Sequence, residues 1–286
     1  MPITRKILST IILAMIAIVA ASLIMGRSQE RSAASALADI QAAIPPLTEK
    51  GVEPPALSAT VVFMKRLATG EILLDRESRL ELPVASLTKL MTALLLVELS
   101  PPEGVIAFSA QAKAAGEPDD KRSPIVVGER VSVDGMIQLL LITSANDAAY
   151  AVAEHLGVRS DGGSAGSFAE RINTFVERMN ERARALGLNS TRFANPAGND
   201  DPDNYSTTRD IALLAEFIAR HHPGLWAASR LPETVLRTQD GRSYPMVNTN
   251  PLLGEYPALS GSKTGFEDQA RGVLVFLYSL APDDML

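Results

Sequence analysis

The apolar residues of this chain recur with two different periods, which predict strands at both ends and helices between them. Ala59–Phe63 and 71–74 are apolar-rich segments that flank the turn pair Thr69-Gly70, which is typical of a β-hairpin. Between Phe168 and Leu186 the apolar residues return every three or four positions, which predicts an amphipathic helix. A second helix is expected from Thr207 to His222.

Strand patterns return in the last third of the chain. Residues 233–238 and 243–248 flank Asp240-Gly241, which predicts another hairpin, and residues 272–280 predict a long apolar strand. Strands at both ends with helices between them predict an α+β fold, in which an antiparallel sheet is flanked by helices.

Two segments are apolar on nearly every face. They are residues 87–96, which follow Ser86, and residues 136–142, which precede Ser144. A helix without a polar face belongs in the interior of a domain. We therefore expect both segments to be buried, with a further helix starting at Asp147.

The N-terminal residues predict export across a membrane. Arg5 and Lys6 precede an apolar run from residue 7 to residue 26, which is long enough to cross a bilayer as a helix. Small residues at Val19 and Ala21 would suit a signal peptidase, but the apolar run continues beyond them. We therefore favour a retained signal anchor at residues 1–26 over a cleaved signal peptide, with the rest of the chain on the outer face of the bacterial cytoplasmic membrane.

Residues 27–57 predict a stalk, because an Ala-rich stretch is followed by two Pro-Pro pairs. This division leaves residues 58–286 for a single folded domain. The chain is 46% hydrophobic with a formal net charge of -6, so its composition argues against a nucleic-acid partner. It contains no cysteine, which excludes thiol catalysis, disulfides and thiolate metal sites.

Three short motifs follow one another along the chain: Ser86-Leu87-Thr88-Lys89, Ser144-Ala145-Asn146 and Lys263-Thr264-Gly265. Each is weak alone, because serine and lysine are common. Their joint order and spacing indicate an active-site serine enzyme whose base is a lysine.

Ser86 and Lys89 are three residues apart, so on a helix they share a face and can form a hydrogen bond. Burial and a second cation, for which Lys263 is the candidate, would lower the pKa of Lys89 and make it a base. The structural alternative makes Ser86 a helix cap and Lys89 a solvated side chain. That alternative leaves a charged residue unexplained in a very apolar segment.

The other two motifs have chemical and structural interpretations as well. Ser144 could relay a proton to the leaving group and Asn146 could hold a substrate carbonyl, although both are also ordinary turn residues. Lys263 and Thr264 would receive a carboxylate on a strand edge, where Gly265 allows close approach. A phosphate-binding loop is rejected, because glycines that it requires are missing.

Together with these motifs, longer blocks resemble the serine-type D-alanyl-D-alanine carboxypeptidases, the low-molecular-mass penicillin-binding proteins. The blocks are residues 83–92, 144–149, 193–198 and 205–210, and the resemblance covers most of residues 57–280. It implies a β-lactamase-like fold, with an antiparallel sheet against a helical subdomain.

The resemblance also implies that Ser86 attacks the terminal D-alanyl-D-alanine bond of peptidoglycan stem peptides. The backbone N–H groups of Ser86 and Phe266 would form the oxyanion hole. β-Lactams would acylate the same serine, and neither a metal nor an organic cofactor is implied.

Two departures from the family pattern stand out. Glu267 occupies a position where the family usually has threonine, which places an acidic group near a site for a carboxylate. The sequence ends at Leu286, soon after one strand, where the family normally adds another strand and a closing helix. We therefore expect a C-terminally truncated catalytic domain.

Several alternatives remain from the residues alone. An exported β-lactamase would need a water-activating carboxylate, for which no clear motif exists. A peptidoglycan endopeptidase and a non-catalytic, membrane-tethered muropeptide-binding protein both remain possible interpretations. His155, His221 and His222 are expected to be structural, because nothing in their spacing suggests a Ser/His/Asp triad or a zinc site.

Overall fold

A computed structural model describes residues 56–116, 123–158, 166–281 and 284–286. The expected anchor at residues 7–26, and nearly all of the expected stalk, therefore lie outside the described residues. Within the described ranges, no helix combines the length and the apolar character that a membrane span requires.

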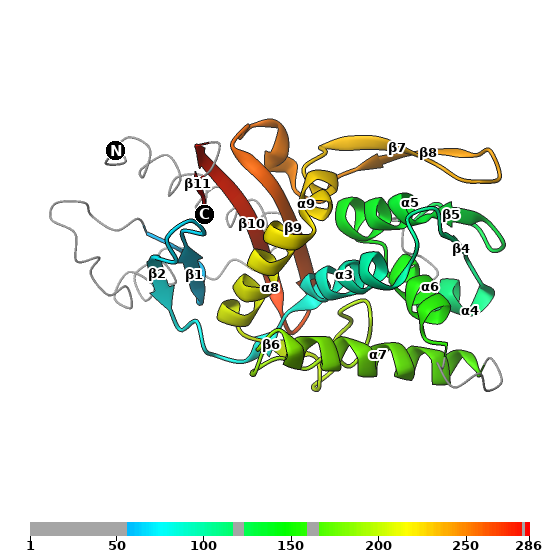
Figure 1. Ribbon diagram of the computed structural model, residues 1–286, viewed down its shortest axis with the longest axis horizontal. Coiled ribbons are helices and arrows are strands. Elements are labelled where there is room, and N and C mark those ends of the chain that lie inside the picture. Colours follow the sequence, from blue (N-terminus) through cyan, green and yellow to red (C-terminus); the bar gives the residue numbers. More distant parts are fainter. Residues whose placement is uncertain (1–55, 117–122, 159–165, 282–283) are drawn as a thin grey trace, which may run out of the picture.

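The longest strands form the centre of the molecule (Figure 1). β9 (Leu259–Glu267) pairs antiparallel with β10 (Arg271–Ala281), which pairs in turn with the short β11 (Asp284–Met285). The strand order β11-β10-β9 leaves β9 at the end of this sheet. The prediction that Lys263 lies on an edge strand is thereby confirmed.

The predicted N-terminal hairpin is present as a separate two-stranded sheet. β1 (Val62–Lys65) pairs with β2 (Ile72–Arg76), and Gly70 takes a positive φ of 74° in the turn between them. β1 begins later than the expected Ala59, because pairing with β2 stops at Val62 opposite Arg76. The residues just before β1 instead line the groove described below.

The helices form a group on the side of β9 and β10 away from β1 and β2 (Figure 1). They are α3 (Lys89–Leu99), α4 (Ala110–Ala115), α5 (Val133–Gln138), the π-helical η2 (Leu139–Thr143), α6 (Asn146–Leu156) and α7 (Phe168–Ala185). A small sheet of β4 (Val105–Ala107) and β5 (Arg130–Ser132) lies among them. α7 begins with a capping box, in which Ser167 and Glu170 exchange hydrogen bonds with each other's backbone.

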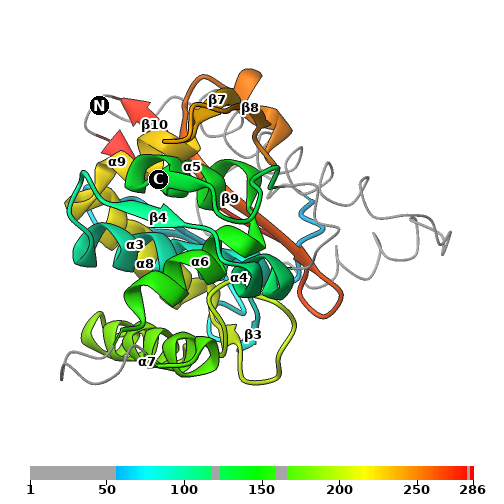
Figure 2. The same ribbon diagram turned by 90° about the vertical axis from the view of Figure 1, so that its right-hand side faces the viewer.

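Two further helices join this group to the sheet. α8 (Thr208–His221) packs against β1 and β10, and α9 (Pro223–Ser229) packs against β9. The hairpin of β7 (Glu233–Arg237) and β8 (Ser243–Val247) matches its prediction to within one residue at each end. Both views place this hairpin and α7 at opposite margins of the molecule (Figures 1 and 2).

The short connecting elements hold the site in place. β3 (Leu82–Pro83) pairs with β6 (Tyr205–Ser206). In the chain, β3 comes just before the 3-10 turn η1 (Ala85–Thr88). A second 3-10 turn, η3 (Pro251–Gly254), leads from β8 towards β9.

The main core surrounds α3, as its pattern predicts. Every residue of α3 from Lys89 to Leu96 is buried, and α5, η2 and α6 contribute most of the apolar side chains around it. A helix that is apolar on all faces can be stable only when neighbours cover every face. The sequence segments without a polar face thus form the centre of the helical group.

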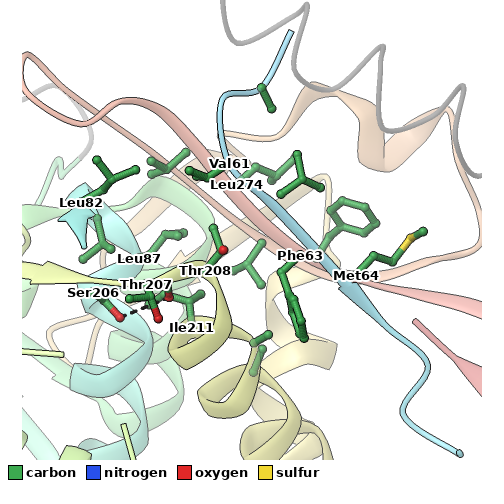
Figure 3. Close-up of a pocket in the computed structure, with 18 of the residues that line it drawn as sticks. Val61, Phe63, Met64, Leu82, Leu87, Ser206, Thr207, Thr208, Ile211 and Leu274 are labelled. Atoms are coloured by element: carbon green, nitrogen blue, oxygen red, sulfur yellow. Dashed lines mark hydrogen bonds between the residues drawn. The ribbon is translucent and has the colours of Figure 1, made fainter. Parts of the chain in front are cut away.

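An apolar groove of about 560 Å³ lies between β1, β10 and α8. Phe63 and Met64 of β1 line one wall, and Leu82 and Leu87 lie on the opposite side (Figure 3). Val273 and Val275 of β10 are also among the lining residues. We call this feature the β1–β10 groove.

Candidate active site

Ser86 lies in a tight turn just before the buried helix. The turn η1 spans Ala85–Thr88, and Lys89 is the first residue of α3. In a 3-10 turn, side chains three residues apart are nearly eclipsed. Lys89 Nζ accordingly donates a hydrogen bond of 2.9 Å to Ser86 Oγ. The expected contact is present, although a 3-10 turn rather than the α-helix itself brings it about.

Lys89 is completely enclosed, with 0% of its side chain area exposed. Its Nζ also donates to Asn146 Oδ1 and to the Ala197 carbonyl oxygen, each at 2.6 Å. Ser86 caps neither η1 nor α3, whose N-caps are Val84 and Thr88. The structural alternative of a capping serine beside a solvated lysine is therefore wrong.

Ser144 occupies the sharp connection between η2 and α6. Its φ of 61° is left-handed, which is uncommon for a residue with a side chain and characteristic of functional sites. In this conformation Ser144 Oγ accepts a hydrogen bond of 2.9 Å from Lys263 Nζ. The second motif is thereby connected to the third, across 119 positions of sequence.

Asn146 is the first residue of α6 and is buried. Its Oδ1 is used by Lys89, whereas its Nδ2 has no hydrogen-bond partner among the described residues. A buried amide N–H normally has a partner, because leaving it unpaired costs about 1–3 kcal/mol. The Asn146 Nδ2 group is therefore a donor available to a ligand in this site.

β9 carries the third motif directly against the Ser86 turn. A Cβ atom at Gly265 would lie only 2.9 Å from the Ser86 backbone nitrogen. Only glycine allows this approach. Phe266 follows with its side chain half-exposed, and Arg271 stands opposite Glu267 in the β9–β10 register.

The 197–198 loop holds the other side of the Ser86 turn. Ala85 has a left-handed φ of 45°, and Gly198 has a φ of 89°. A Cβ atom at Gly198 would lie 1.9 Å from the Ala85 carbonyl oxygen, so the two backbones are in direct contact. The Ser86 turn is thus held between β9 and this loop.

Three contributions to the site, from Ala197, Asn195 and Thr249, were not predicted from the sequence. The Ala197 carbonyl contacts Lys89, and Asn195 fixes its loop because Asn195 Oδ1 accepts from the backbone N–H groups of residues 197, 198 and 199. The only signal was the family-like block at residues 193–198. Thr249 Oγ1 accepts a hydrogen bond from Thr264, and no motif or pattern in the sequence indicated this role.

The remaining candidate groups lie elsewhere. His221 and His222 contact the ring of Phe217 at the end of α8, and His155 lies on α6. In the part of the chain that the structure describes, no group of three histidine, aspartate or glutamate residues could hold a metal ion. The side chains of all three motifs instead gather at the junction of β9, η1 and the start of α6.

This arrangement, in which a buried lysine contacts the predicted nucleophile Ser86, is the one expected for an active-site serine enzyme. The comparison with known families agrees, because the D-alanyl-D-alanine carboxypeptidase family of peptidases matches residues 48–279. The chain belongs to this family.

Curated relatives include D-alanyl-D-alanine carboxypeptidase DacF of Bacillus subtilis, which is 32% identical over 71% of this chain and 49% of its own length. A D-alanyl-D-alanine endopeptidase of Pseudomonas aeruginosa is 34% identical over 72% of this chain and 63% of its own length. The chain therefore spans roughly half to two thirds of the length of these relatives.

Among solved structures, a Streptomyces DD-transpeptidase superimposes with a TM-score of 0.69 at 25% identity. The match covers 79% of this chain and 87% of that chain. The predicted fold class, an α+β fold of the DD-peptidase and β-lactamase type, is thereby confirmed.

Proposed function

We propose that this protein is a serine-type D-alanyl-D-alanine carboxypeptidase that removes the terminal D-alanine from peptidoglycan stem pentapeptides. The observation that carries the proposal is the meeting of all three motifs. Lys89 Nζ contacts both Ser86 Oγ and Asn146 Oδ1, and Lys263 Nζ contacts Ser144 Oγ. Family membership and the names of the relatives support the same activity.

In the first step, Ser86 Oγ attacks the carbonyl carbon of the bond between the two D-alanines. Lys89, as the neutral amine, takes the hydroxyl proton, because its Nζ is within hydrogen-bond distance of that oxygen. The negative charge that develops on the carbonyl oxygen would be stabilised by the backbone N–H groups of Ser86 and Phe266. The close contact of Gly265 with the Ser86 nitrogen supports this placement.

The tetrahedral intermediate then collapses. The bond to the terminal D-alanine breaks, and the proton that Lys89 took from Ser86 is relayed through the Ser144 hydroxyl to the departing amine nitrogen, which leaves Lys89 neutral again. Lys263, which donates to Ser144, would position that hydroxyl and attract the terminal carboxylate together with Thr264. Water hydrolyses the resulting ester on Ser86 and regenerates the enzyme.

The remaining substrate would lie along the free edge of β9. An extended peptide can pair with an edge strand through its backbone, and the unpaired Nδ2 of Asn146 would hold a peptide carbonyl. β-Lactams would acylate Ser86 by the same attack. We place this reaction on the outer face of the bacterial cytoplasmic membrane, with residues 7–26 as a retained anchor, or in a secreted form if the signal is cleaved.

The proposal is tested by D-alanine release from a diacetylated lysyl-D-alanyl-D-alanine peptide. The full chain in mild detergent is compared with its Ser86→Ala variant, and both are incubated with a fluorescent penicillin. Release and covalent labelling that are both lost in the variant support the carboxypeptidase. A folded protein that neither releases D-alanine nor becomes labelled would overturn the carboxypeptidase and favour the non-catalytic, muropeptide-binding alternative.

A second candidate activity is cleavage of peptidoglycan cross-links, because the Pseudomonas aeruginosa relative is named an endopeptidase. Incubation with a purified cross-linked dimeric muropeptide separates the two activities. Conversion of dimer to monomer at a higher kcat/KM than D-alanine release would make endopeptidase the principal activity.

A further inference from the structure

Thr249 lies in a short connection that is fixed on both sides. Its neighbours Asn248 and Asn250 are buried, and their side-chain amides donate to the carbonyls of Ser229 and Leu231 and to Ser262 Oγ, at 2.9–3.0 Å. These bonds attach the connection to α9 and to β9 at once. Thr249 is therefore held in one place between them.

Thr249 is also attached to both of the later motifs. Its backbone N–H donates to the carbonyl of Ile142, in the π-helix that Ser144 follows directly. Its Oγ1 accepts a hydrogen bond of 2.6 Å from Thr264 Oγ1. Both threonines are only partly buried, whereas the adjacent Lys263 is 1% exposed. The two hydroxyls thus form a polar pair at the accessible margin of the site.

Counting the hydroxyl hydrogens of Thr249 and Thr264 shows which of the two can donate to an anion. Two hydroxyls carry two hydrogens, and one of these is used in the bond between them. Because Thr264 donates in that bond, the second hydrogen belongs to Thr249. A carboxylate oxygen can accept a hydrogen bond but cannot donate one. In this arrangement Thr249, rather than Thr264, has the hydrogen that an anion can accept.

We propose that Thr249 positions the substrate: with Thr264 it forms one hydroxyl pair that receives the C-terminal carboxylate of the peptide. This inference rests on the proposed function, because it assumes a peptide with a free terminal carboxylate. The nearby Lys263 supplies the positive charge, and the pair supplies directed hydrogen bonds. Thr249 is thus a determinant of specificity that lies outside the three motifs.

The test compares two peptides, one with a free D-alanine carboxylate and the same peptide with a C-terminal amide. For Thr249→Val, we expect kcat/KM on the free acid to fall about tenfold, mainly through KM, because a hydrogen bond to a charged group is lost. On the amide, the change is expected to be at most about twofold, since no charge is bound. Thr249→Ser should restore the free-acid value to within about threefold.

Thr264→Val and the double variant complete a thermodynamic cycle. If the hydroxyls act as one unit, the double variant should lose about as much as the more damaged single variant, rather than the product of both losses. Multiplicative losses, or equal losses on the acid and the amide, overturn the proposal. Thr249→Ala removes the same hydroxyl with no added branching, so it provides the same measurement if the valine variant fails to fold.

The failures of the two proposals are distinguishable. Wild-type protein that is folded but releases no D-alanine overturns the proposed function, and the role of Thr249 with it. Active wild-type protein with an unchanged Thr249→Val variant overturns the role of Thr249 alone.

Discussion

The motif cluster and the β1–β10 groove are two junctions between strands and helices, and they are built in opposite ways. The motif cluster, which we define as Ser86, Lys89, Ser144, Asn146 and Lys263, is a buried set of polar side chains connected by hydrogen bonds of 2.6–2.9 Å. The groove has mostly apolar walls and an open volume of about 560 Å³. Directional hydrogen bonds connect the side chains of the first region, whereas the walls of the second make mostly non-directional apolar contacts.

The two regions differ because different interactions hold the Ser86 turn and the β1–β2 hairpin to the rest of the protein. The Ser86 turn is in direct backbone contact with Gly198 on one side and closely approached by Gly265 on the other. Across the groove, the β1–β2 hairpin forms its own sheet, and ion pairs such as Lys65–Glu216 connect it to α8. Buried hydrogen bonds and backbone contact fix geometry, whereas apolar walls and partly exposed ion pairs tolerate change.

The largest expected effect comes from removing Lys89, the proposed base, from the motif cluster. Lys89→Met keeps most of the apolar stem but removes the group that contacts Ser86 Oγ. We expect the rate of penicillin acylation to fall by at least about a thousandfold. Stopped-flow or gel-based labelling measures this rate, and circular dichroism confirms the fold. Acylation at an unchanged rate would remove Lys89 from its role as general base.

The next largest effect should come from disturbing the backbone contact between Gly198 and the Ser86 turn. Gly198→Ala places a methyl group against the Ala85 carbonyl at a left-handed φ, so we expect the free energy of unfolding to fall by about 2–4 kcal/mol. Gly187→Ala is the matched control, because Gly187 has a φ of 76° and open space around it. It should cost only about 1 kcal/mol. Urea unfolding measures both, and equal losses would contradict the close contact.

A smaller effect on stability is expected where Lys65 of the β1–β2 hairpin contacts Glu216 of α8. Burial raises the pKa of the Glu216 carboxyl, but hydrogen bonds and charge from Lys65 and Arg220 outweigh burial and hold that pKa below its usual value. A carboxyl whose pKa is lowered by folding stabilises the fold above its ordinary pKa of 4.5. The stabilisation is lost as the pH falls through the folded-state pKa.

Glu216→Gln should therefore reduce the free energy of unfolding by about 1 kcal/mol at pH 7 and by progressively less below pH 4.5. Glu71→Gln is the control, because the Arg66–Glu71 pair has a carboxylate that is 51% exposed. It should change stability by only a few tenths of a kcal/mol. A Glu216→Gln penalty that stays constant between pH 7 and pH 3.5 would contradict the charge argument.

The smallest effect should come from enlarging a side chain in the groove. Ala212 of α8 lines this open space, so Ala212→Leu should change stability by less than about 0.5 kcal/mol. The same substitution at Ala153, which is fully buried in α6, should cost about 1–3 kcal/mol through overpacking. Thermal unfolding of both variants compares the two. Equal penalties would show that the groove is packed as tightly as the core.

The sequence by itself determined much of the architecture of this protein. Hydrophobic periodicity predicted α7, the helix-start signals at Thr207 predicted α8, and the Asp240-Gly241 turn predicted the β7–β8 hairpin, each almost to the residue. The segment after Ser86, which is apolar on nearly every face, predicted a buried helix, and the order of the three motifs predicted which side chains would meet. The periodicity, the turn and cap signals and the apolar segment are local properties, so they can be read from neighbouring residues.

Only the tertiary structure decided how the site is assembled. Several features of the site depend on segments that are far apart in sequence. They are the 3-10 turn at Ser86, the left-handed backbone of Ser144, the contact of the Ala197 carbonyl with Lys89, and the Thr249–Thr264 hydroxyl pair. A backbone carbonyl is present at every residue, and a threonine between two asparagines has no distinctive pattern. Their roles arise only when packing brings β9, α6 and the 195–199 loop around one turn, since hydrogen bonds and close contacts act over a few ångströms.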